Sequence, residues 1–144
     1  MEAHKYQVDL EWKTERKGEI SSPVLDQQIE VATPPEFPKG MAGIWSPEHL
    51  FTAAVSSCFM TTFLAIAENS NLSFTSLKCP AEGILDKKDG KFAMTKVLLK
   101  PVLTIPNEED REKAEKIMMK AEKACLISNS ITSEVHLEPK VIIK

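Results

Sequence analysis

The sequence is poor in cysteine, with only three in 144 residues. An odd number does not suit a secreted disulfide framework, so we expect a reducing compartment, the cytoplasm. No two cysteines have the C-x-x-C spacing, which excludes a thioredoxin-like dithiol. A G-x-S-x-G turn is also missing, so nothing marks a serine nucleophile.

The sequence also lacks a large net charge and a long apolar segment among its first residues. The net charge is -3, and this argues against a surface that binds phosphates or nucleic acid. The first residues lack the apolar run of a secretory signal, so none is expected. No repeat or low-complexity tract interrupts the chain, and its length predicts a single domain over residues 1–144.

One uncharged run, from Phe51 to Ala67, approaches the length of a membrane-spanning helix. Five serine and threonine side chains make this run too polar for a simple span, and Glu48 and Glu68 close it at both ends. We therefore expect a buried helix of a soluble protein.

Alternating residues predict strands near the N-terminus. From His4 to Trp12 apolar and polar side chains alternate, which indicates a half-buried strand. Lys17-Gly18 is typical of a turn, followed by strands over 19–22 and 24–31 and by a loop rich in proline and glycine.

Ser46-Pro47-Glu48 has the residue types that begin a helix. We expect this helix to continue to about Asn69 and to stop near Asn71. Because it is apolar nearly all round, it should lie at the centre of the fold or of an oligomer.

The C-terminal half predicts a hairpin, a helix and a strand. Asp89-Gly90 joins two β-rich runs, 75–87 and 92–105. A second helix should begin at Asn107, with an apolar stripe that ends at Cys125, and a last strand over 133–143 should bend at Pro139. The order βββ-α-ββ-α-β predicts an α+β fold, with a largely antiparallel sheet covered by helices on one face.

Cysteine is the residue type that could carry chemistry here. Cys58 lies in the middle of the apolar helix and Cys125 at the end of the second helix. A free cysteine on an apolar helix is often only a small core residue, so a core role and a thiol site both stay open. Cys79, before Pro80, is expected to be a spectator.

A metal site is not predicted. His49, Glu48 and the cysteines are suitable zinc ligands, but no paired ligand spacing occurs, and His49 lies about 13 Å from Cys58 along the helix. No cofactor is expected either. Arg16, one of only two arginines, follows the first predicted strand and could point into a cleft.

Two segments resemble the OsmC/Ohr family of hydroperoxide reductases. The stretch Trp45–Phe59, WSPEHLFTAAVSSCF, is similar to the central-helix signature, in which a Pro-Glu-x-Leu opening precedes a reactive Cys-Phe. The stretch Ala124–Asn129, ACLISN, is similar to the family's second-cysteine segment. Proline usually follows that second cysteine in the family, whereas this chain has Leu126.

The resemblance implies an intertwined homodimer with two active sites at the subunit interface. It gives Cys58 the peroxidatic role and Cys125 the resolving role, through a Cys58–Cys125 disulfide. Glu48 matches the carboxylate that fixes the family's arginine, and Arg16 matches the arginine, with Lys17 competing for that place. The implied substrate is an organic hydroperoxide, and the implied reductant is a dithiol, including lipoyl groups.

The chemistry sets one further requirement. Burial in an apolar helix alone would raise the pKa of Cys58 and make the thiol inert, so we expect a cation, Arg16, to offset the desolvation. Two alternatives stay open: a non-enzymatic OsmC-like dimer that binds a small apolar ligand in the interface cleft, and a structural dimer whose cysteines belong to the core.

Overall fold

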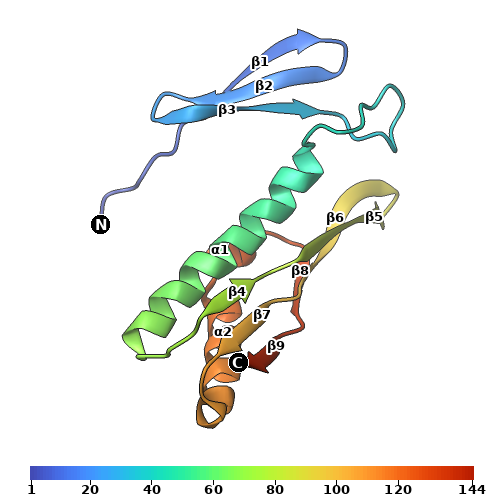
Figure 1. The fold of residues 1–144 in the computed structure, drawn as a ribbon. Helices are drawn as coiled ribbons and strands as arrows, with labels where there is room; N and C mark the ends of the chain where they lie inside the picture. Colours follow the sequence, from blue (N-terminus) through green and yellow to red (C-terminus); the bar gives the residue numbers. More distant parts are fainter. The chain divides into compact units, whose positions relative to one another are not determined.

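A computed structural model describes the whole chain, residues 1–144, as three strands, a helix, four strands, a helix and two strands (Figure 1). The chain forms two compact units, Met1–Leu50 and Phe51–Lys144. The predicted α+β class is confirmed, and most strand pairs are antiparallel.

The first unit contains an antiparallel sheet of β1 (Asp9–Thr14), β2 (Lys17–Ser22) and β3 (Leu25–Ala32). One row of partners across the three strands is apolar: Leu10, Ile20 and Ile29. The next row is acidic: Glu11, Glu19 and Glu30. Since neighbouring rows point to opposite faces, the sheet has one apolar and one acidic face, as the alternation predicts. Strand β1 begins at Asp9 and not at His4, and all its residues are exposed within the chain, so the predicted half-burial is not observed.

The first turn differs from the prediction. The chain reverses at Glu15-Arg16, where Glu15 has a φ of 50°, while Gly18 lies inside β2 opposite Trp12. A Cβ at Gly18 would lie 2.8 Å from the Glu11 carbonyl oxygen, so this glycine permits a close approach of two strands. The prediction that Lys17-Gly18 forms the turn was therefore wrong by two residues.

Helix α1 (Pro47–Asn69) begins and ends as predicted. The Ser46 hydroxyl oxygen accepts a hydrogen bond of 3.1 Å from the His49 N–H, which caps the helix. The chain leaves the helix through Asn71, whose φ of 55° is left-handed.

Only one face of α1 is buried within the chain. Its members recur every four residues: Val55, Phe59, Phe63 and Ala67. Met60 and Leu64, on another face, are 42% and 40% exposed. By length and composition α1 could cross a membrane, but its buried face belongs to the hydrophobic core of the second unit.

Prolines break the long strands that the sequence predicts in the second unit. The hairpin consists of β5 (Ala81–Lys88) and β6 (Lys91–Leu99), joined at Asp89-Gly90 by two residues of positive φ, as predicted. Pro80, Pro101 and Pro139 separate further short strands, because proline cannot donate to a ladder. These are β4 (Ser76–Lys78), β7 (Val102–Ile105), β8 (Glu134–Leu137) and β9 (Lys140–Ile143).

The two C-terminal strands add parallel pairs to this unit. β8 runs parallel to β6, and β9 runs parallel to β7. The resulting sheets have the orders β4-β7-β9 and β5-β6-β8. The bend predicted at Pro139 is thus a break that transfers the chain from one sheet to the other.

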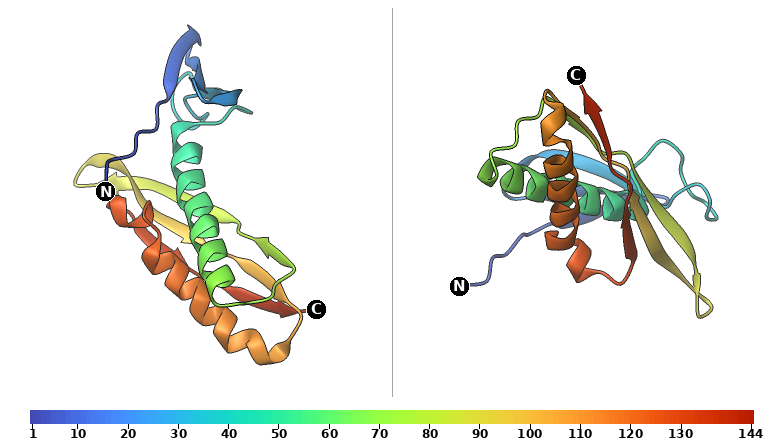
Figure 2. Two further views of the ribbon diagram at one scale, coloured as in Figure 1. Left: turned by 90° about the vertical axis from the view of Figure 1, so that its left-hand side faces the viewer. Right: turned by 90° about the horizontal axis from the view of Figure 1, so that it is seen from below.

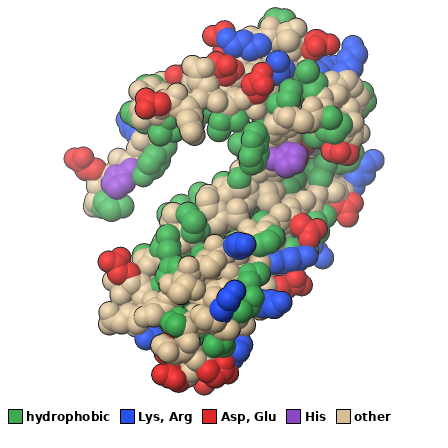
Figure 3. Space-filling model, in the orientation of Figure 1, with side chains coloured by type: hydrophobic (Ala, Val, Ile, Leu, Met, Phe, Trp, Pro, Cys, Tyr) green, Lys and Arg blue, Asp and Glu red, His purple; other side chains and the backbone are tan.

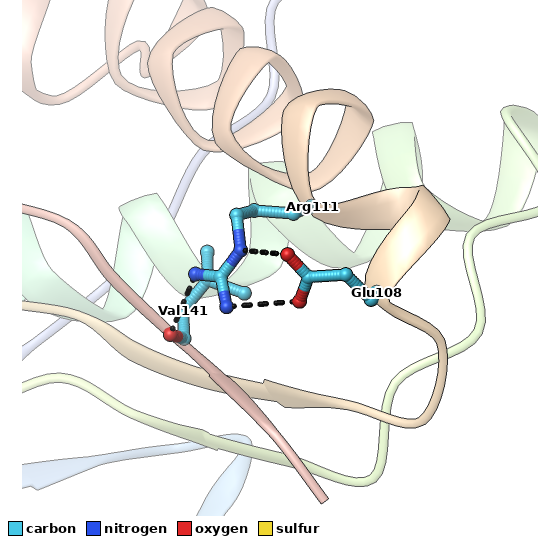
Figure 4. A network of polar contacts seen from close by, with 3 residues as sticks. All are labelled: Glu108, Arg111 and Val141. Atoms are coloured by element: carbon cyan, nitrogen blue, oxygen red, sulfur yellow. Dashed lines mark hydrogen bonds and ion pairs between the residues drawn. The ribbon is translucent and has the colours of Figure 1, made fainter.

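Helix α2 (Arg111–Ala124) follows a 3-10 turn over Glu108–Asp110, so the α-helix begins four residues later than predicted. Arg111 binds both carboxylate oxygens of Glu108 at 3.0 Å and donates to the Val141 carbonyl at 3.2 Å (Figure 4). These bonds fix the start of α2 to β9. The predicted apolar stripe is buried, including Cys125 directly after the helix.

Both helices pack on strands of the second unit around one core (Figure 2). Phe59 and Phe63 are fully buried and stack at 6.3 Å, and Phe74 meets Phe63 edge-on at 5.4 Å. This core fixes the position of α1, which carries Cys58, relative to α2, which is followed directly by Cys125.

A close approach of α1 to the hairpin at Gly83 supplies a stability test. A Cβ at Gly83 in β5 would lie 2.0 Å from Thr52 Oγ1 and 2.8 Å from Met94 Cε. Gly83→Ala should therefore lower the free energy of unfolding in urea by about 1–3 kcal/mol.

Thr52→Ala opens the space that the new methyl group needs. The double variant should thus lose clearly less stability than the sum of the two single variants. Strictly additive losses would show that Gly83 is not required for this approach.

Candidate thiol site

Helix α1 presents Cys58 at the edge of its buried face, where the side chain is partly exposed. Thr62, one turn later, lies on the same side, with its hydroxyl oxygen 3.9 Å from the Cys58 sulfur. The hydroxyls of Ser56, Ser57 and Thr61 donate instead to backbone carbonyls of the helix. Thr62 is thus the hydroxyl residue of this run that can donate to the sulfur.

Cys125 ends α2 and is fully buried. Its extended backbone, with φ -65° and ψ 114°, turns the chain out of the helix. A tight turn follows, closed by the Asn129 N–H, which donates to the Cys125 carbonyl at 3.1 Å. The turn includes a 3-10 segment, Ser128–Ser130.

The second unit brings the two cysteines together. The Cys125 thiol and the backbone N–H groups of Leu126 and Ile127 lie near enough to the Cys58 sulfur to lower the pKa of that thiol. Cys58 therefore lies against both the resolving candidate and the turn that follows it.

The surroundings of Cys58 favour its thiolate. Burial raises the pKa of this thiol, but four hydrogen bonds together outweigh burial and hold the pKa below its ordinary value. The donors are the Ile127 N–H, the Cys125 thiol, the Thr62 hydroxyl and the Leu126 N–H.

Cys125 is shifted in the opposite direction. Burial raises the pKa of its thiol, and the hydrogen bond and negative charge of Cys58 raise it further. The hydroxyl and N–H of Ser128 oppose this rise without cancelling it. The pair is thus asymmetric: Cys58 ionises first, and the Cys125 thiol stays protonated and donates a hydrogen bond to the Cys58 sulfur.

The donors that lower the pKa of Cys58 are neutral. Hydrogen bonds within the second unit thus lower the pKa of Cys58 without the cation that the sequence analysis expects, and the contribution of Arg16 stays a prediction. Leu126, which stands where the family usually has proline, contributes to the lowered pKa of Cys58, since a proline at this position would have no N–H to donate.

The other predicted site residues lie in the first unit. Arg16 forms part of the β1–β2 turn, and its carbonyl accepts a hydrogen bond from the Thr33 N–H at 3.3 Å. Lys17, its competitor, forms an ion pair of 3.1 Å with Glu30. Glu48 is half-buried in the first turn of α1. The catalytic roles of Arg16 and Glu48 stay predictions.

Two further observations concern Cys79 and His49, to which the sequence analysis gives no role in the thiol site. Cys79 is half-buried, and burial raises the pKa of its thiol. His49 uses Nδ1 in a 2.7 Å hydrogen bond with the Ser46 hydroxyl. No group of three or more metal-binding side chains forms in the chain.

The sequence analysis missed Thr62, Leu126, Ile127 and Ser128 as groups of the site. Helical spacing could have revealed Thr62, because positions four apart share a face. The backbone donors could not be found in this way, since they face Cys58 only once α1 and α2 are packed together.

Removing one backbone donor tests this geometry. Leu126→Pro should raise the pKa of Cys58, because the variant loses an N–H that stabilises the thiolate. The residue before it tolerates proline, since Cys125 is already extended. The pH dependence of Cys58 alkylation measures the shift.

Leu126→Ala is the matched control, because it removes the side chain and keeps the N–H. Its titration should follow that of the wild type. Equal pKa values in the proline and alanine variants would contradict the role of this N–H.

Comparison with known proteins places this chain in a family. The family described as OsmC-like protein matches residues 40–140, which include both cysteines. Peroxiredoxin OsmC of Escherichia coli is 33% identical over 125 residues, 85% of this chain and 84% of that protein. The uncharacterised protein YmaD of Bacillus subtilis is 28% identical over 152 residues, 100% of this chain and 97% of that protein.

Solved structures agree. An OsmC-like protein of unknown function from Vibrio cholerae superposes with a TM-score of 0.85 at 28% identity, over 95% of this chain and 99% of that one. An organic hydroperoxide resistance protein OsmC from Legionella pneumophila gives a TM-score of 0.77 at 23% identity, over 99% and 100% of the two chains. The chain belongs to the OsmC-like protein family.

Proposed function

We propose that this protein is a cytoplasmic thiol peroxidase that reduces organic hydroperoxides to alcohols. The observation that carries the proposal is the asymmetric pair: a partly exposed Cys58 with a lowered pKa beside a buried Cys125 with a raised one. A low-pKa, accessible cysteine next to a second thiol is the arrangement that redox-active cysteines use.

The first step is attack by the Cys58 thiolate on the terminal oxygen of the hydroperoxide. The O–O bond breaks, the alkoxide leaves and takes a proton to become the alcohol, and Cys58 becomes a sulfenic acid. The sulfur of Cys125 then attacks the Cys58 sulfur, and the hydroxyl leaves as water. Two thiols and one hydroperoxide thus give a disulfide, an alcohol and water.

The names of two relatives and the surroundings of Cys58 support the proposed substrate class. The Escherichia coli relative is named a peroxiredoxin, and the Legionella structure is named for organic hydroperoxide resistance. The Leu126 side chain, next to the donating N–H, is 67% exposed and offers an apolar surface to an organic substrate. A dithiol, such as a lipoyl group, would regenerate the two cysteines by thiol–disulfide exchange.

Arg16 and Glu48 complete the proposed site. A guanidinium near Cys58 would add to the neutral donors and would stabilise charge on the departing alkoxide. Glu48 would hold that guanidinium by a bidentate pair. We propose that both act at an interface between subunits, as the family resemblance implies.

A second copy of the chain is the proposed partner. The apolar face of the β1–β3 sheet exposes 70% of Leu10 and 73% of Trp12, and hydrophobic side chains are visible on this unit in Figure 3. Three strands need a covered apolar face for stability. Together with the exposed apolar side chains of α1, this face supports a homodimer.

The rival function keeps the fold without turnover: an OsmC-like dimer that binds a small apolar ligand in the interface cleft. Treatment with one equivalent of cumene hydroperoxide separates the two functions. The peroxidase should lose two thiols per chain, whereas a binding module should lose none.

Variants assign the roles. Cys58→Ser should abolish turnover, and Cys125→Ser should stop after one oxidation, with sulfenic acid trapped by dimedone and seen by mass spectrometry. Cys79→Ser is the control and should leave the rate unchanged. A disulfide that includes Cys79 in the oxidised wild type would contradict this assignment.

The dimer has its own test. Leu10→Gln should weaken association in light scattering, because it places an amide on the apolar face. Glu11→Gln adds the same side chain to the acidic face and should leave the molar mass of the assembly, as measured by light scattering, unchanged. A folded monomer of the wild type at micromolar concentration would refute the homodimer.

A further inference from the structure

Disulfide formation places a demand on Cys125 that its burial opposes. The attacking sulfur must be a thiolate, yet burial raises the pKa of this thiol. A group that stabilises the anion at Cys125 is therefore needed for the second step.

Ser128 is placed to do this. Its N–H donates to the Cys125 sulfur at 3.5 Å, and its hydroxyl faces the same sulfur. The hydroxyl oxygen is buried and forms no hydrogen bond in the structure of the chain. A buried hydroxyl without a competing partner is free to donate to the sulfur.

The turn that carries Ser128 is held in place. The Ser130 N–H donates to the Ile127 carbonyl at 3.0 Å, and the Asn129 side chain donates to the Lys123 carbonyl at 3.0 Å. The donors of Ser128 are thus preorganised and need not be assembled during the reaction.

We propose that Ser128 is the positioning residue that prepares Cys125 to attack the oxidised Cys58. This inference rests on the proposed peroxidase function and concerns only its second step. Ser128 lies in the stretch that resembles the family's second-cysteine segment, and its contact with Cys125 comes from the packed turn.

The timing follows from charge. While Cys58 is a thiolate, its negative charge keeps Cys125 protonated. Oxidation converts Cys58 to a neutral sulfenic acid, which removes that charge. The pKa of Cys125 then falls, and the two donors of Ser128 favour the thiolate. Its sulfur forms the S–S bond as the S–O bond breaks, and the leaving hydroxide takes a proton to become water.

The kinetic test uses the full-length protein and cumene hydroperoxide. Ser128→Ala should leave the rate of sulfenic acid formation at Cys58 within about twofold, and it should slow disulfide formation about tenfold near neutral pH, because a hydrogen bond to a charged group is lost. The defect should shrink as the pH rises, since more Cys125 ionises without help. Ser128→Thr, which keeps the hydroxyl, should restore the rate.

Ser130→Ala is the matched control. It removes a hydroxyl from the same turn that donates to the Leu126 carbonyl at 2.7 Å and not to a sulfur. Disulfide formation in this variant should keep the wild-type pH profile. An equal slowing in both serine variants would assign the effect to the turn and overturn the role of the Ser128 hydroxyl.

A second measurement needs no turnover. In a Cys58→Ser, Cys79→Ser background only Cys125 titrates as a thiol, and its thiolate can be followed by ultraviolet absorbance. Adding Ser128→Ala should raise the pKa of Cys125, and an unchanged pKa would overturn the inference.

The two levels of proposal fail differently. Wild-type protein that forms no sulfenic acid and loses no thiols would refute the peroxidase function. Wild-type protein that forms the disulfide, with Ser128→Ala equally fast at every pH, would refute only the role of Ser128.

Discussion

The contact between the turn after α2 and the sulfur of Cys58 is the interaction on which the site depends. It is made by the backbone N–H groups of Leu126 and Ile127 and by the Cys125 thiol, and the Thr62 hydroxyl of α1 adds a further donor. Helix α1 alone would leave Cys58 at the edge of an apolar face, where burial disfavours the thiolate. The packed core of the second unit brings the donors to the sulfur, so stability and reactivity share one origin.

Neutral donors and a cation would stabilise the Cys58 thiolate in different ways. Hydrogen bonds from a fixed turn are little affected by salt, whereas a guanidinium acts over a longer range and is screened at exposed positions. The two contributions proposed for Cys58 can therefore be separated by experiment: the turn through Leu126 and the cation through Arg16. The same turn serves Cys125 through Ser128, so one short segment controls both sulfurs.

The surface of the chain carries a second constraint. The three-stranded sheet has an apolar row on one face and three glutamates on the other, and its apolar face is left without a packing partner within the sheet. The apolar face requires cover, and so do the exposed Met60 and Leu64 of α1. A second copy of the chain would present the same apolar surfaces and could cover them. The proposed homodimer and the proposed site at its interface therefore form one hypothesis.

The sequence by itself determined the elements and the two cysteines. Ser46 and Asn71 set the ends of α1, Asp89-Gly90 set the hairpin, and the apolar stripe of α2 led to Cys125, because caps, turns and periodicity are local properties. The sequence predicts continuous strands through Pro80 and Pro101 and only a bend at Pro139, whereas the structure has a break at each of the three prolines. Only the tertiary structure decided that Cys58 meets Cys125 and that the N–H groups of Leu126 and Ile127 stabilise the thiolate. Such donors belong to every residue except proline, so residue types cannot reveal them, and only the packing of α1 against α2 aims them at one sulfur.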